Sequence, residues 1–414
     1  MIAKKYDVVL ACGGFGTRLK EITNDTPKPL FPVAGKSTLE RCIKQLEIYN
    51  FKNVIITIGY KSKKFLKFID ELNQKYKVDI DIYVEENPLG ECGALWVIKD
   101  KLCKDFVFIN GDIIFSIDFK KLCLFHRRLS SKLTLVTHTS EHPDDSDLVS
   151  VPNGNLVENI FLKGDDRHSE KNAYLGNSGI FIINKEVLDK LKAPQEKDSK
   201  SVFHFIVKKV FELKINIYSY NTTEYIKDMG TPKRLNLVAE DLSKGKVNRK
   251  NYTNIQKALF LDRDNTLIKC SIGQYVINKN QIEILSKNIE KIIPISLDYD
   301  LVCLVTNQPV IAMGKISLRE LDEINSTLVK SCLSMGLKID IVSFCPHHPH
   351  KGYEGEIEIL KYDCFCRKPN PGQFFEQSFL RNINLKDSLM IGDSDYDLLA
   401  AQNAGCNFLN VNDL

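Results

Sequence analysis

Apolar runs alternate with amphipathic stretches along almost the whole chain, and this pattern restricts the possible folds more than any other feature of the sequence. Runs such as 7–14, 53–60 and 105–111 have the length of β-strands, whereas 38–49 and 62–76 show the apolar spacing of helices. Strands that alternate with helices form mostly parallel sheets that helices cover on both faces. The sequence therefore predicts an α/β fold with doubly wound sheets.

The alternation stops once, in a polar and basic stretch at residues 243–256, and starts again with the apolar run 257–262. A chain of 414 residues is also too long for one ordinary domain. We therefore expect two domains, 1–242 and 257–414, joined by a linker at 243–256.

Composition excludes several classes of protein. A hydrophobic content of 43% with 27% charged residues is typical of globular proteins, and no run approaches the roughly 18 apolar residues that cross a bilayer. The formal charge of +4 is small and does not indicate nucleic-acid binding. Anionic phosphate substrates or ordinary surface composition would each account for it. The sequence therefore predicts neither a membrane segment nor a nucleic-acid partner.

The cysteines and the N-terminus both bear on the compartment. Twelve cysteines are mostly scattered through the predicted strands and helices, which favours buried thiols over a disulfide framework. The N-terminus leads directly into a glycine-rich turn and is typical of a first strand, not of a signal peptide. We therefore expect a cytoplasmic protein.

A glycine-rich turn follows the first predicted strand, and two cations follow the turn. Gly13, Gly14 and Gly16 let the backbone approach phosphate oxygens and offer N–H donors, although such a turn can also be a tight connection only. Arg18 and Lys28 are suited to neutralise the charge that develops on a triphosphate under attack. This region is a candidate nucleotide site.

The segments GGFGTRL, TPKPLFPVAGK, PLGECGAL and NGD occur in this order and together resemble the sugar-phosphate nucleotidylyltransferase family over residues 1 to about 240. In that family the sugar-phosphate oxygen attacks the α-phosphorus of the nucleotide and pyrophosphate leaves. The resemblance implies that Gly13, Gly14, Gly16, Thr17, Glu85, Glu86 and Gly90 contact the nucleotide, that Arg18 and Lys28 hold its phosphates, that Asp112 and Asp228 bind Mg²⁺, and that Lys163 and Asn177 contact the sugar phosphate.

The sequence departs from the family pattern at one position that bears on the sugar. It also leaves more than one possibility for the nucleobase of the NTP. Leu162 replaces a glutamate that usually contacts the sugar, which puts hexose recognition in question. Glu85 and Glu86 precede the segment in which the family reads the base. One carboxylate can accept both guanine donors, N1–H and N2–H₂, which favours GTP over another NTP. The alternative is that both glutamates are solvated at a strand end. Asp112, taken alone, could equally cap a turn.

Two carboxylates stand at the exit of the first strand of the second half. Asp262 and Asp264 are two residues apart and point the same way, so that one can attack phosphorus and the other can move a proton. The alternative is a solvated acidic turn. Thr306-Asn307, Arg367-Lys368 and Asp393 follow at the ends of later apolar runs or in loops.

This order resembles the haloacid dehalogenase (HAD) phosphatase superfamily over residues 257–414, in a form without a cap domain, so that loops must select the substrate. Asp397 is expected to orient its neighbours and not to bind metal. The resemblance implies that Asp262 is the nucleophile, that Asp264 is the general acid and base, that Thr306, Asn307, Arg367 and Lys368 bind the sugar phosphate, and that Asp262, Asp264 and Asp393 hold Mg²⁺, Asp264 through its backbone carbonyl.

A set of cysteine and histidine pairs interrupts the second half. Cys345-x-His347 and Cys364-x-Cys366 have the spacing of a closed Cys₃His site, which predicts structural Zn²⁺. Free thiols in a surface loop are the alternative, and a neighbouring histidine could replace His347. The segment resembles the zinc-bearing branch that contains heptose bisphosphate phosphatase and histidinol phosphatase.

The two resemblances together imply two successive reactions on one sugar. A heptose 1,7-bisphosphate must lose its C7 phosphate before the C1 phosphate of the resulting heptose 1-phosphate is nucleotidylylated. We therefore expect a fused heptose bisphosphatase and heptose 1-phosphate guanylyltransferase. The alternatives are a hexose (mannose-like) 1-phosphate nucleotidylyltransferase with a phosphatase of different purpose, or with a regulatory, inactive second domain. The anomer and the oligomeric state stay open.

Overall fold

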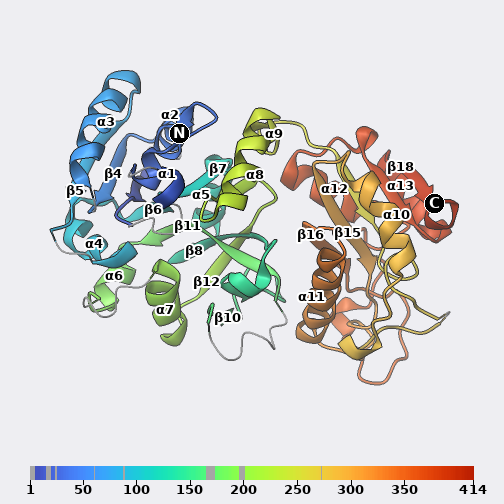
Figure 1. Cartoon of the computed structure of the whole chain (residues 1–414). Coiled ribbons are helices and arrows are strands. Elements are labelled where there is room, and N and C mark those ends of the chain that lie inside the picture. The colour runs from blue at the N-terminus through green and yellow to red at the C-terminus, as the bar shows by residue number, and fades with distance from the viewer. Residues whose placement is uncertain are drawn as a thin grey trace. The chain divides into compact units, whose positions relative to one another are not determined.

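The computed structural model describes residues 5–14, 20–23, 26–59, 61–86, 89–164, 173–194, 201–271 and 273–414. Two compact units make up the chain. Residues 1–137, 155–157 and 177–251 form the first, and residues 138–154, 158–176 and 252–414 form the second. Figure 1 shows the elements of both in chain order.

A nine-stranded sheet lies in the first half of the sequence, in the order β10-β9-β11-β6-β1-β4-β5, with β8 paired to β11 and β12. The pairs β6–β1, β1–β4 and β4–β5 are parallel, whereas β11 runs antiparallel to β6. Its strands are β1 (Asp7–Ala11), β4 (Asn53–Ile58), β5 (Asp79–Val84), β6 (Asp105–Asn110), β8 (Leu133–Thr139), β9 (Leu148–Ser150), β10 (Asn159–Phe161), β11 (Leu175–Asn184) and β12 (Ile217–Asn221).

Apolar residues on both faces of the parallel strands explain why helices cover them. Val8 and Leu10 of β1 pack in one core with residues of α2 and α3, while Val9, between them, is buried on the opposite face. The helices of this half are α1 (Lys20–Thr23), α2 (Thr38–Ile48), α3 (Ser62–Lys75), α4 (Gly90–Ile98), α5 (Phe119–Arg128), α6 (Glu186–Lys190), α7 (Lys208–Glu212), α8 (Pro232–Ser243) and α9 (Lys246–Arg249).

Two short antiparallel pairs complete this half, and one of them matters for the candidate site. The strands β7 (Ile113–Ser116) and β13 (Tyr225–Asp228) pair so that Asp228 lies opposite Ile113. The other pair is β2 (Pro32–Val33) with β3 (Lys36–Ser37). The segment 243–256, expected to be a linker, contains α9, whose Val247 is buried against α8.

A five-stranded, fully parallel sheet lies in the second half, in the order β16-β15-β14-β17-β18. Leu259 and Leu261 of its central strand pack with α10 and α11, and Phe260 packs with α12 and α13 on the other face. Its elements are β14 (Ala258–Leu261), α10 (Ser286–Ser296), β15 (Leu301–Asn307), α11 (Leu318–Ser334), β16 (Ile341–Cys345), α12 (Gly372–Arg381), β17 (Leu389–Gly392), α13 (Asp395–Ala404) and β18 (Asn407–Asn410).

These sheets confirm the predicted fold class, α/β with two mostly parallel sheets. Within the described part of the chain, no helix combines the length and the apolar character needed to cross a membrane.

Candidate active sites

The strand ends of the first unit bring two carboxylates and two cations together. Nζ of Lys28 lies 2.5 Å from Oδ2 of Asp112, the residue before β7. Asp228, at the end of β13, accepts hydrogen bonds from Nη1 of Arg234 at 2.9 and 3.1 Å. Because Asp228 lies opposite Ile113, it lies one residue from Asp112 across the strand pair. The two carboxylates predicted to bind Mg²⁺ are thus neighbours, and each carries a cationic partner.

The turn that carries Asp112 packs tightly against the glycine-rich turn. The N–H of Gly111 donates to the carbonyl oxygen of Ala11 at 2.9 Å. A Cβ at Gly111 would lie 2.6 Å from Sγ of Cys12 and 2.7 Å from that carbonyl oxygen. Glycine is therefore required here, and the close approach fixes Asp112 beside the start of the turn.

Glu85 lies beside the same turn, whereas Glu86 is exposed. A Cβ on Gly13 would lie 3.6 Å from Oε1 of Glu85, and Oε2 accepts a hydrogen bond from the N–H of Leu89 at 3.3 Å. Burial raises the pKa of Glu85, and the hydrogen bond from Leu89 opposes that rise. Gly90 begins α4 with a φ of +72°. Of the two glutamates, only Glu85 is thus close to the glycine-rich turn.

The remaining residues predicted for this site either lie outside the described residues or contact other residues of the protein. Gly14 precedes the segment 15–19, and Gly16, Thr17 and Arg18 lie outside the described residues. Lys163 forms an ion pair with Asp145, and its N–H donates to Oδ1 of Asp147 at 2.8 Å. Asn177 lies in β11, where its Oδ1 accepts from the N–H of Gly179.

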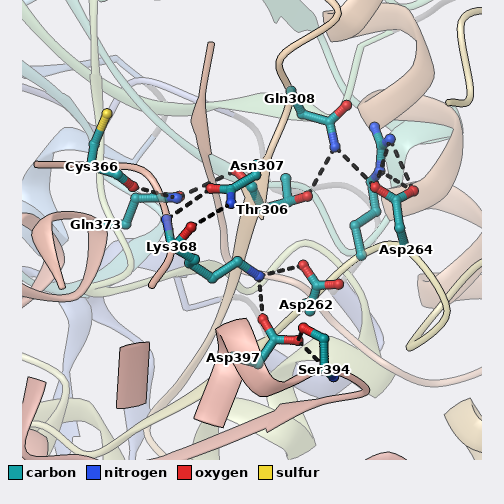
Figure 2. A network of polar contacts seen from close by, with 11 residues as sticks. Asp262, Asp264, Thr306, Asn307, Gln308, Cys366, Lys368, Gln373, Ser394 and Asp397 are labelled. Atoms are coloured by element: carbon teal, nitrogen blue, oxygen red, sulfur yellow. Dashed lines mark hydrogen bonds and ion pairs between the residues drawn. The ribbon is translucent and has the colours of Figure 1, made fainter. Parts of the chain in front are cut away.

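The second unit has a buried ion-pair cluster at the carboxyl ends of its central strands. Nζ of Lys368 lies 2.5 Å from Oδ1 of Asp262 and 2.5 Å from Oδ1 of Asp397, and Figure 2 shows the ammonium between the two carboxylates. All three side chains are at least nine-tenths buried. The hydroxyl of Ser394 donates to the other oxygen of Asp397 at 2.6 Å. Each carboxylate is therefore held in place, and Lys368 neutralises part of their charge.

Electrostatics at this cluster favour binding a further cation. Burial raises the pKa of Asp262, with Lys368 opposing the rise, and burial together with Asp397 raises the pKa of Asp393. Oxygen atoms of Asp262, Asp393 and Asp397 lie within 4.8 Å of one another. Three carboxyl groups lie near one ammonium, so a hard divalent cation bound there would stabilise the charged form that burial disfavours.

Asp264, the predicted general acid and base, has fixed partners on both oxygens. Nε and Nη2 of Arg263 donate to Oδ1 at 3.1 and 3.0 Å. Nε2 of Gln308 donates to Oδ2 at 3.2 Å and to Oγ1 of Thr306 at 2.9 Å. Asn265 follows with a φ of +57°, which asparagine tolerates better than most residues in place of glycine.

Two residues predicted to bind substrate contact neighbouring backbone. Asn307 accepts from the N–H of Lys368 and donates to its carbonyl oxygen, both at 3.0 Å. Nη1 of Arg367 donates to the carbonyl oxygen of His347 at 3.2 Å. Asn307 therefore fixes the backbone that carries the Lys368 ammonium.

The four residues predicted to bind Zn²⁺ form one cluster. Sγ of Cys364 lies 3.4 Å from Sγ of Cys345 and 3.4 Å from Sγ of Cys366. Nδ1 of His347 lies 3.6 Å from Sγ of Cys345 and 3.2 Å from Sγ of Cys366. Tetrahedral zinc requires ligand atoms about 3.5–3.8 Å apart. The donor set and its geometry therefore fit zinc closely.

The partner of His347 supports the same arrangement. The hydroxyl of Tyr362 lies 2.9 Å from Nε2 of His347. When Nε2 carries the ring proton and donates it to this hydroxyl, Nδ1 is left free to bind a metal. The hydrogen bond from Cys345 lowers the pKa of Cys366, which favours the thiolate form that metals bind.

A family model described as nucleotidyl transferase matches residues 6–245, more than half of the chain. The chain belongs to the nucleotidyl transferase family. A second model, described as HAD-hydrolase-like, matches residues 365–413.

Curated relatives of this nucleotidyl transferase include mannose-1-phosphate guanyltransferases. The enzyme of Yarrowia lipolytica is 28% identical over 232 residues, which cover 54% of this chain and 61% of the relative. That of Schizosaccharomyces pombe is 29% identical over 230 residues, with the same coverage. The chain thus spans about three fifths of the length of these relatives. Among solved structures, HddC from Yersinia pseudotuberculosis is 25% identical with a TM-score of 0.48, and the match covers 57% of this chain and 99% of HddC.

The two matched ranges divide the candidate residues. Lys28, Asp112 and Asp228 lie inside the nucleotidyl transferase match, and Lys368 and Asp393 lie inside the HAD-like match. Arg367 and Asp397 also lie inside the HAD-like match, whereas Asp262, Asp264 and Thr306 lie before residue 365, so their place in the second site is supported by the contacts described above.

Sequence reasoning missed several residues of both sites. Gln308 directly follows the predicted pair Thr306-Asn307, and Arg263 stands between the two predicted carboxylates. This adjacency was the only sequence signal for them. Arg234 and Tyr362 had no such signal.

Proposed function

We propose that this chain is a bifunctional enzyme of nucleotide-sugar synthesis. Its second unit hydrolyses the C7 phosphate of a heptose 1,7-bisphosphate, and its first transfers GMP from GTP to the heptose 1-phosphate, giving GDP-heptose and pyrophosphate. The observation that carries the proposal is the buried Asp262–Lys368–Asp397 cluster in a chain of the nucleotidyl transferase family. The cluster argues against an inactive regulatory domain, because a structural role does not require three buried ionic groups.

The phosphatase step follows from the cluster. The carboxylate of Asp262 attacks phosphorus and forms an aspartyl phosphate, as the bond from phosphorus to the sugar oxygen breaks. Asp264 in its acid form gives its proton to that oxygen and then takes a proton from the water that hydrolyses the intermediate. Lys368 and the Thr306 hydroxyl contact the phosphoryl oxygens. Mg²⁺ bound by Asp262 and Asp393 would neutralise phosphoryl charge.

The transferase step requires no covalent intermediate. The oxygen of the sugar phosphate attacks the α-phosphorus of GTP, and pyrophosphate leaves. Lys28 and, by the resemblance, Arg18 neutralise the charge on the phosphates, and Asp112 and Asp228 would hold Mg²⁺ there. The names of the curated relatives support guanine.

Those names also support a second candidate, a mannose-like hexose 1-phosphate as the acceptor. The two are separated by kcat/KM for both anomers of heptose 1-phosphate and for mannose 1-phosphate, with GTP and with the three other NTPs. We expect the highest value for one heptose anomer with GTP. A higher kcat/KM for mannose 1-phosphate would favour a hexose 1-phosphate as the acceptor.

Glu85→Gln should weaken the preference for GTP by about 1–3 kcal/mol, because the amide mispairs with a guanine donor that the carboxylate accepts. Glu86 is exposed, so Glu86→Gln is the matched control and should keep the preference of the parent. The measurement is kcat/KM for GTP, CTP, UTP and ATP. A parent that prefers CTP or UTP, or an unchanged preference in Glu85→Gln, would refute this role.

We expect about one Zn²⁺ per chain in protein prepared without chelators, bound by Cys345, His347, Cys364 and Cys366. Cys364→Ser should lower zinc content and phosphatase activity together, because Lys368 follows four residues after Cys364. Cys406→Ser is a control, since Cys406 is buried in a different core. Metal analysis by mass spectrometry checks this, and zinc-free protein with full phosphatase activity would contradict it.

A further inference from the structure

The side chain of Gln308 joins two residues of the proposed phosphatase site. It is 1% exposed and follows directly after β15. Its Nε2 donates to Oγ1 of Thr306 at 2.9 Å and to Oδ2 of Asp264 at 3.2 Å, as Figure 2 shows. An amide nitrogen has two hydrogens, so both are used in this bridge.

The hydrogen bonds of Gln308 determine which proton Thr306 can donate and how the carboxylate of Asp264 is oriented. Because Oγ1 of Thr306 accepts from Gln308, its own hydroxyl proton remains available to donate to a phosphoryl oxygen. Asp264 is held on Oδ2 by Gln308 and on both oxygens by Arg263, which is fully buried. At 1% exposure, water cannot readily replace the hydrogen bonds of Gln308 if its amide is removed.

We propose that Gln308 is a positioning residue, which orients Asp264 for proton transfer to the leaving sugar oxygen and links it to the phosphate-binding hydroxyl of Thr306. This inference depends on the phosphatase function proposed above. Gln308 itself exchanges no proton. It holds Asp264 so that the proton reaches the sugar oxygen as the bond from phosphorus to that oxygen breaks.

The dependence of kcat/KM on the leaving group distinguishes a positioning role of Gln308 from a merely structural one. A sugar alkoxide is a poor leaving group and needs the proton of Asp264, whereas p-nitrophenolate leaves without one. The ratio kcat/KM reports the steps up to the first bond cleavage, for either substrate. Loss of the Gln308 amide also removes the hydrogen bond that Thr306 accepts, but the Thr306 hydroxyl keeps the proton that it donates to the phosphoryl group of either substrate. A variant of this kind should therefore lose activity toward the sugar phosphate and keep most of it toward p-nitrophenyl phosphate.

The experiment compares the full-length parent and Gln308→Met, which keeps the length of the side chain without its amide, with Mg²⁺ present. We expect kcat/KM for phosphate release from heptose 1,7-bisphosphate to fall about 10- to 100-fold, and that for p-nitrophenyl phosphate to fall less than threefold. Because both values come from one preparation, a partly folded sample leaves their ratio unchanged.

Gln373→Met is the matched control. Gln373 is also a buried glutamine, and its Nε2 donates to the carbonyl oxygens of Thr306 and Cys366 but not to Asp264. It should lower both kcat/KM values by the same factor. If Gln308→Met yields no folded protein, Gln308→Asn, whose shorter amide cannot reach both partners, takes its place with the same expectation.

An equal loss for both substrates in the Gln308 variant would overturn the positioning role while leaving the phosphatase function intact. A parent that releases phosphate from neither substrate would overturn the proposed function and this inference with it. The two failures are thus distinguishable.

Discussion

Asp262→Asn should abolish phosphate release and leave nucleotidyl transfer from supplied sugar 1-phosphate unchanged. An asparagine amide cannot form the aspartyl phosphate, so we expect a loss of roughly 10⁴-fold or more. The variant should fold, because asparagine keeps the shape of Asp262 and Lys368 keeps its ion pair with Asp397. The measurement is the initial rate of phosphate and of pyrophosphate release, followed separately.

Asp112→Asn is the reciprocal variant and should lose transfer while keeping phosphate release. The two sites share no residue, since Asp112 is paired with Lys28 and Asp262 with Lys368. If either variant lost both activities while it remained folded, the proposal of two independent sites would be wrong.

Lys368→Met should destabilise the second unit as well as abolish phosphate release. The substitution leaves the carboxylates of Asp262 and Asp397 buried without their common cation, and removing one partner of a buried ion pair costs about 3–5 kcal/mol. Hydrogen exchange of peptides from β14 and β17, measured without added Mg²⁺, reports the free energy of local unfolding for this unit.

The matched control for that variant is Lys351→Met. Lys351 forms an exposed ion pair with Glu358, at 62% and 85% side-chain exposure, and such pairs contribute little to stability. We expect its exchange to match that of the parent. Equal protection in Lys368→Met and in the parent would contradict the account of the buried cluster.

The strands could be predicted from the sequence because each carries a run of buried apolar residues. The runs around 7–11 and 258–261 end at polar or glycine-rich turns, and parallel strands bring such turns to one edge of a sheet. The Cys–His cluster could be predicted for a similar reason, because its four ligands come in two closely spaced pairs. The helix α9 could not, because four residues with one buried side chain show no period.

Contacts between side chains of different helices, strands and loops could not be predicted from the sequence. The bond of Gln308 to Asp264 depends on where the end of β15 lies relative to the end of β14, and on one rotamer. The same holds for the contact of Asn307, predicted to bind substrate, with the backbone of Lys368. A motif gives the identity of its residues, but not which neighbours each side chain contacts.

The most direct test of the bifunctional proposal is one time course. The whole protein is given GTP, Mg²⁺ and heptose 1,7-bisphosphate of either anomer, and phosphate and pyrophosphate are recorded separately. We predict that, with one anomer, phosphate appears first and that pyrophosphate follows after a lag, in equal final amount, with GDP-heptose as the product. Pyrophosphate release without prior loss of phosphate, or phosphate release with no pyrophosphate for either anomer and any NTP, would contradict the account.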